Sequence, residues 1–184
     1  MTHPHPKGRG SHCPHYQHGH KLFQHGDLAA ARDALLRSVD DDFDNAEAWG
    51  LLARVYAEMD ELEHAAEAAC QAVRSEPDNA EWHVLKGAQV FAINKADEAL
   101  ESYGKALTLD PNHGLAYFSR AFLYAETGKK AEALADLARA VEVEPGTYDL
   151  ISHVEALEAL RDEKGFPKAP SPPPQNNPFG GLGK

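Results

Sequence analysis

The sequence predicts an all-α protein made of stacked helical hairpins, and two regularities lead to this fold class. Prolines recur every 34 residues, at Pro77, Pro111 and Pro145. Two series of small residues keep the same interval: Ala31, Ala65, Ala99 and Ala133, and Ser38, Ala72, Ala106 and Ala140. A fixed interval of this length is typical of a repeat protein in which each unit buries its apolar face against its neighbours.

The apolar side chains within each interval have the spacing of amphipathic helices. Trp49, Leu52 and Tyr56, for example, fall on one face of a helix. Proline cannot continue a helix, so Pro77 ends one unit, while Gly128 lies at the turn between the two helices of another. Each unit is therefore expected to form helix, turn, helix, turn. Four units are predicted, the first of them degenerate, over residues 12–45, 46–79, 80–113 and 114–147.

This pattern resembles the tetratricopeptide repeat, a 34-residue helical hairpin whose copies stack into a right-handed superhelix. In the second unit the signature is carried by Trp49, Leu52, Ala53, Tyr56, Ala65, Ala72 and Pro77. In the third it is carried by Gly87, Ala99, Tyr103, Ala106 and Pro111, and in the fourth by Tyr117, Ala121, Tyr124, Gly128, Ala133, Ala140 and Pro145. The first unit departs from it, because His15 and His18 replace large apolar residues and Phe43 replaces the proline.

Three segments flank the predicted units. Residues 1–11 are expected to form a disordered, basic, histidine-rich arm. Residues 148–164 are expected to form one capping helix, with an apolar side made of Ile151, Val154, Leu157 and Leu160. Residues 165–184 are rich in proline and glycine and are expected to be a disordered tail. This tail could also be a ligand for other domains, or fold into the chain's own groove through Phe179 and Leu182.

Composition narrows the functional classes. The chain has 29 acidic and 18 basic residues and a formal net charge of -11, which disfavours binding to nucleic acid. No apolar run approaches the roughly 20 residues that cross a bilayer, so we expect no membrane insertion and predict a cytoplasmic protein. Cys13 and Cys70 are expected to remain thiols. No catalytic or cofactor motif is evident, so a non-catalytic protein without a cofactor is predicted.

The resemblance implies that the first helix of each unit lines a concave groove, which usually holds an extended peptide or a helix. The groove positions carried over are Leu51, Arg54, Glu58, Val84, Leu85, Phe91, Leu115, Phe118, Phe122 and Glu126. This face is apolar with acidic edges. We therefore expect a scaffold or chaperone-like adaptor that binds an apolar or amphipathic peptide or helix of a partner protein.

A second hypothesis assigns metal handling to the N-terminal arm and leaves docking to the repeats. Seven of the chain's 11 histidines lie within residues 1–25, and His12, Cys13 and His15 place three donor groups within four residues. Imidazole and thiolate are suitable ligands for Zn²⁺ and Ni²⁺. The sequence has no recognisable second group of metal ligands that would complete a site with this cluster. Weak Zn²⁺ or Ni²⁺ binding by a metal-handling accessory protein is therefore kept as the alternative, with no metal ligand assigned.

Overall fold

The computed structural model describes residues 13–170, which form ten α-helices and no strand. The helices are α1 (Pro14–Gln24), α2 (Leu28–Asp41), α3 (Ala46–Glu58), α4 (Leu62–Ser75), α5 (Ala80–Ala92), α6 (Ala96–Leu109), α7 (Gly114–Glu126), α8 (Lys130–Val143), α9 (Thr147–Ile151) and α10 (Glu155–Glu158). The starts of α3, α5 and α7 keep the 34-residue interval seen in the sequence. Every helix of this range is too short or too polar to span a lipid bilayer.

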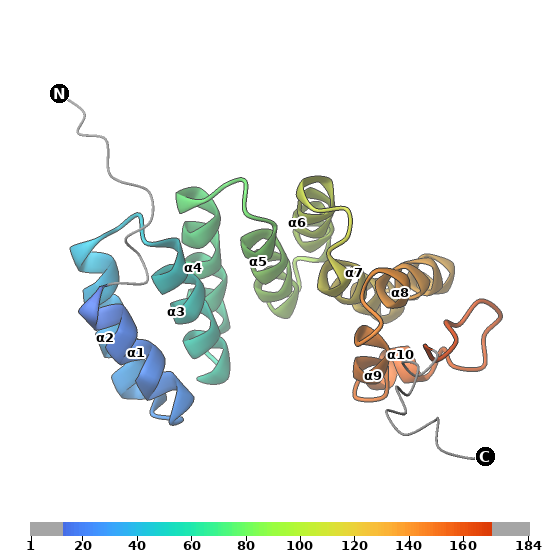
Figure 1. The fold of residues 1–184 in the computed structure, drawn as a ribbon, viewed down its shortest axis with the longest axis horizontal. Coiled ribbons are helices and arrows are strands. Elements are labelled where there is room, and N and C mark those ends of the chain that lie inside the picture. The colour runs from blue at the N-terminus through green and yellow to red at the C-terminus, as the bar shows by residue number, and fades with distance from the viewer. Residues whose placement is uncertain (1–12, 171–184) are drawn as a thin grey trace, which may run out of the picture.

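The first eight helices pair into hairpins that follow one another along the long axis of the molecule (Figure 1). α1 packs on α2, α3 on α4, α5 on α6 and α7 on α8, and each second helix packs on the next hairpin. The first helices also lie close to one another along their backbones, from α1 through α3 and α5 to α7, whereas the backbones of successive second helices of the described range lie farther apart. We call the continuous surface of α1, α3, α5 and α7 the first-helix face. The predicted all-α stack of hairpins is confirmed.

Small side chains allow the helices of each hairpin to approach closely. The two series with the 34-residue interval are 0 % exposed throughout, at Ala31, Ala65, Ala99 and Ala133 and at Ser38, Ala72, Ala106 and Ala140. Protein interiors are packed so densely that larger side chains at these points would push the helices apart. The repeat in the sequence is therefore a repeat of close helix contacts.

A ring near the start of each later hairpin is hydrogen-bonded to the loop that precedes it. Each bond reaches the carbonyl oxygen six residues earlier, in the pairs Trp49 with Phe43 at 2.8 Å, His83 with Pro77 at 2.8 Å and Tyr117 with Pro111 at 3.3 Å. The nitrogen Nε2 of His83 must carry the proton, because a carbonyl oxygen only accepts. Three chemically different side chains thus hold successive hairpins in the same register.

Glycine is required where the two helices of the third hairpin cross. A Cβ atom at Gly87 would lie 2.5 Å from Cε1 of Tyr103, well inside van der Waals contact. Tyr103 is 2 % exposed, so its ring is surrounded by the packed core. Burial also raises the pKa of the Tyr103 phenol, which therefore stays neutral and acts as a packing group.

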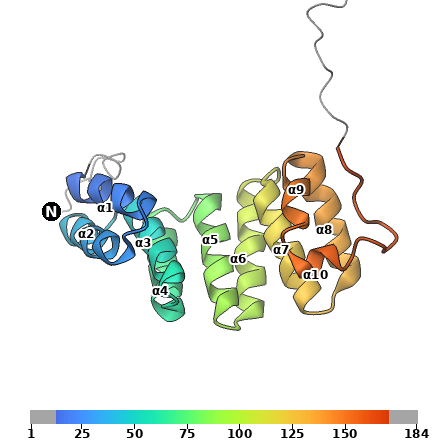
Figure 2. The ribbon, with the colours of Figure 1, turned by 90° about the horizontal axis from the view of Figure 1, so that it is seen from below.

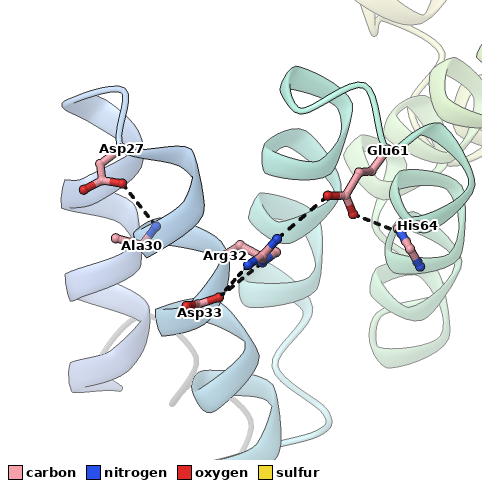
Figure 3. Close-up of polar contacts among 6 residues, drawn as sticks. All are labelled: Asp27, Ala30, Arg32, Asp33, Glu61 and His64. Carbon is pink, nitrogen blue, oxygen red and sulfur yellow. Dashed lines mark hydrogen bonds and ion pairs between the residues drawn. The ribbon is translucent and has the colours of Figure 1, made fainter.

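Polar side chains join the first two hairpins on the side of the second helices (Figure 3). Arg32 of α2 donates to Asp33 at 3.0 Å, and a second guanidinium nitrogen lies 3.8 Å from Glu61, the N-cap of α4. The other carboxylate oxygen of Glu61 lies 3.1 Å from Nδ1 of His64. These side chains are in contact with water, which screens their charges, so each pair contributes little to the stability of the fold. Glu61 and His64, three residues apart in the sequence, thus form a contact on the protein surface.

The segment after the fourth hairpin departs from the single helix predicted over residues 148–164. It forms α9 and α10, separated by Val154 in an extended conformation with φ -124° and ψ 105°. Ile151, Leu157 and Leu160 are all buried. Side chains spaced by three residues drift about 60° per step around an unbroken α-helix. The chain must break to keep them all on the core, so the prediction is corrected to two short helices.

Candidate peptide-binding face

The structure divides the ten predicted groove residues into an accessible and a buried group. Exposed or partly buried are Arg54, Glu58, Phe91, Leu115, Phe122 and Glu126. Buried in the core are Leu51, Val84, Leu85 and Phe118, which are between 5 % and 9 % exposed. All four belong to the apolar clusters that fill the space between neighbouring helices. The candidate face is therefore restricted to the six accessible residues.

Two aromatic rings connect α5 to α7 on this face. The centroids of Phe91 and Phe122 are 5.7 Å apart, and their planes meet edge to face at 85°. Such a pair stabilises the contact by about 0.5–1.5 kcal/mol beyond the area it buries. Both rings remain partly exposed. They form an apolar surface that crosses the junction between the third and fourth hairpins.

Glu81 at the start of α5 connects three of the first helices by polar contacts. Its two carboxylate oxygens lie 3.1 Å from Nη2 of Arg54 on α3 and 3.4 Å from Nε2 of His113, the N-cap of α7. The Arg54 and Glu81 side chains are 49 % and 43 % exposed, so their ion pair contributes about 0–1 kcal/mol. Because Glu81 balances the charge of Arg54, the exposed carboxylates of Glu58 and Glu126 make the face acidic.

The C-terminal segment covers the end of the first-helix face. Figure 2 shows α9 and α10 beside the last hairpin, and α10 contacts α7. Leu157 and Leu160 belong to the same apolar cluster as Phe118, and Phe122 packs against this cluster. This explains why Phe118 is buried although its position on the helix predicts a groove residue. The accessible face ends near Phe122.

An additional depression, of about 200 Å³, lies on the side of the second helices. It is lined by residues of α2, α3 and α4, namely Leu36, Trp49, Leu52, Tyr56, His64, Glu67, Ala68 and Gln71. Beside it Phe43 is 61 % exposed and stacks edge to face on Trp49. The repeat pattern does not indicate this surface, because Phe43 stands where the other units have proline.

The structure also brings an unpredicted residue to the start of α1. Asp41, in the last turn of α2, has a carboxylate oxygen 2.7 Å from Nδ1 of His15. The predicted hairpin could have indicated this contact, because in an antiparallel pair the first turn of one helix lies beside the last turn of the other. The arm over residues 1–11, His12, and the tail from residue 171 onward lie outside the described residues.

Stacked hairpins with one shared face of first helices define a solenoid repeat protein. Models of the tetratricopeptide repeat match residues 22–88 and 115–147, and a TPR repeat model matches residues 87–128. The chain belongs to the tetratricopeptide-repeat proteins, whose stacked hairpins serve as protein-interaction modules.

Solved structures with the same fold include MamA and YrrB. One crystal structure of MamA is 22 % identical, with a TM-score of 0.67, and the match covers 80 % of this chain and 84 % of that chain. Another is 23 % identical, with a TM-score of 0.66 and coverages of 85 % and 86 %. YrrB, described as a TPR protein with an unusual peptide-binding site, is 20 % identical, with a TM-score of 0.63 and coverages of 86 % and 81 %. No curated protein matches the sequence.

Proposed function

We propose that this protein is a non-catalytic scaffold or chaperone-like adaptor that binds an amphipathic peptide or helix of a partner protein on its first-helix face. The observation that carries the proposal is the partly exposed Phe91 and Phe122 pair, with the exposed carboxylates of Glu58 and Glu126 on the same face. The rings would take the apolar side of the ligand, and the carboxylates its lysine or arginine side chains. YrrB shares the fold and has a peptide-binding site, which supports this use of the surface.

The expected affinity is modest. Each aromatic anchor contributes about 1.5–3 kcal/mol when it is buried by a ligand. Association itself costs about 4–15 kcal/mol in lost freedom of motion. Because this cost offsets much of what the few accessible anchors contribute, we expect weak binding to a short peptide.

A charge-reversal experiment tests the location and chemistry of the site. The probe is a fluorescein-labelled helical peptide of leucine and lysine, whose binding to the full chain is followed by fluorescence anisotropy. Glu58→Lys with Glu126→Lys is expected to weaken binding about three- to thirtyfold, because two carboxylates would no longer attract the lysines. Both residues are exposed, so the helical fold should be unaffected.

The matched control is Glu101→Lys with Glu132→Lys, which reverses two exposed charges on α6 and α8. Either pair changes the net charge from -11 to -7, so a purely long-range attraction would respond equally to both. Leu36→Glu probes the depression on the side of the second helices. Equal effects of the two pairs, or loss of binding in Leu36→Glu alone, would contradict the proposed site.

A further inference from the structure

Three side chains with metal-binding groups meet where the first hairpin closes on itself. Cys13 precedes α1, His15 lies in its first turn, and Asp41 ends α2. One ligand atom from each residue lies within 4.8 Å of the other two. Cys13 and Asp41 are far apart in the sequence, so only the antiparallel hairpin brings them together. This cluster lies outside the first-helix residues used for peptide binding.

The donor set suits a zinc ion. Thiolate, imidazole and carboxylate all bind Zn²⁺, and three protein ligands leave a fourth tetrahedral position for water. With metal–ligand bonds of about 2.0–2.3 Å, the donors around such an ion are about 3.3–3.8 Å apart. The His15 and Asp41 atoms, now 2.7 Å apart, would have to separate by about 0.6–0.8 Å. Their side chains are 43 % and 57 % exposed, so an ion can enter.

Two buried polar side chains form a chain of hydrogen bonds that ends at the sulfur atom of Cys13. The Ser38 hydroxyl donates to Sγ of Cys13 at 3.5 Å, and the Asn45 amide donates to the Ser38 hydroxyl at 3.5 Å. Ser38 is 0 % exposed and Asn45 is 2 % exposed. Hydrogen bonds of this kind orient a ligand and favour the thiolate that binds metal. The hydroxyl is specific to the first unit, since alanine stands at the equivalent places of the other three.

The ligand set is likewise confined to the first hairpin. The equivalent positions hold Glu47, Trp49 and Ser75 in the second unit, Glu81, His83 and Leu109 in the third, and Leu115, Tyr117 and Val143 in the fourth. None of these sets combines three metal ligands. The arrangement at Cys13, His15 and Asp41 is therefore not a by-product of the repeat.

We infer that Cys13, His15 and Asp41 bind a zinc ion that ties the start of α1 to the end of α2. Binding releases the thiol proton of Cys13 to solvent as the sulfur becomes a ligand. It also replaces the hydrogen bond between His15 and Asp41 with two bonds to the metal, and the ring proton of His15 passes through solvent from Nδ1 to Nε2. Because the unfolded chain does not hold these groups together, zinc stabilises the folded first hairpin.

Cobalt and zinc binding to the full chain, kept under reducing conditions, test this site. Co²⁺ is expected to give the near-ultraviolet charge-transfer absorption of a thiolate ligand, which Cys13→Ser removes and Cys70→Ser retains. In competition with a chromophoric chelator, Asp41→Asn is expected to weaken Zn²⁺ binding about tenfold or more. Asp40→Asn, which changes the neighbouring exposed carboxylate, should leave the affinity unchanged. Zn²⁺ should raise the Tm of the unaltered chain and of Asp40→Asn, but not that of Asp41→Asn.

Absence of the thiolate band in the unaltered chain would overturn the proposal whatever the variants do. Equal Zn²⁺ affinity in Asp41→Asn and the unaltered chain would also overturn it, and would assign the binding to histidines of the N-terminal arm. Helical circular dichroism of each metal-free variant checks that the fold is retained. Peptide binding through Glu58 and Glu126 is measured separately, so either proposal can fail alone.

Discussion

Arg120→Met is expected to lower the free energy of unfolding by about 3 kcal/mol, because it leaves the carboxylate of Asp136 buried without its partner. Nε and Nη2 of Arg120 donate to the two carboxylate oxygens at 2.7 Å and 2.8 Å, which ties α7 to α8. Asp136 is 7 % exposed, and its hydrogen bonds raise the pKa of the Arg120 guanidinium. Urea unfolding followed by helical circular dichroism measures the loss.

Arg139→Met is the control, because the Glu142 partner of Arg139 is largely exposed and water screens such a surface pair, so this variant should lose little stability. Replacing both buried partners, as in Arg120→Met with Asp136→Leu, should recover much of the loss since no charge is then left buried. If Arg120→Met is no more harmful than Arg139→Met, the buried pair does not stabilise the fourth hairpin as described.

Gly87→Ala is expected to lower the free energy of unfolding by about 1–2 kcal/mol. Alanine favours a helix over glycine by up to about 1 kcal/mol, but overpacking a core costs about 1–3 kcal/mol. Here the new methyl group would meet the Tyr103 ring at 2.5 Å. The steric cost should therefore exceed the gain in helix propensity. Thermal and urea unfolding of the variant measure the net effect.

Gly104→Ala separates the two contributions, because a Cβ there meets no atom within 4 Å. This variant should be more stable by about 0.5–1 kcal/mol. Adding Tyr103→Leu to Gly87→Ala reproduces the Ala121 and Leu137 combination of the fourth unit and should restore much of the stability. A gain in stability for Gly87→Ala alone would show that the Tyr103 ring can move aside.

The repeat was predictable from sequence because its cause is local and recurs. Close helix crossings require small residues at the same point of every unit, so Ala31, Ala65, Ala99 and Ala133 reveal both the interval and the packing. The break after Ile151 was not predictable in this way. Apolar residues spaced by three fit either one helix or two short ones, and the core they meet in the structure decides between them.

The candidate face was predictable only in outline. The sequence places Phe91, Phe118 and Phe122 on first helices, but it does not show that α10 turns back and covers Phe118. The contact of Asp41 with His15 depends on how the ends of one hairpin align, which periodicity does not specify. Side chains that occur once, outside the repeated pattern, are therefore the ones that only a three-dimensional structure can assign.

α10 turns back and packs onto α7. It therefore occupies the surface on which a further hairpin would stack at that end of the molecule. A second copy of the chain docking there would have to displace Leu157 and Leu160, which are 0 % and 4 % exposed. Exposing two leucines costs about 3–6 kcal/mol. Head-to-tail growth into filaments, a hazard for any open-ended array of identical units, is opposed at this end by α9 and α10.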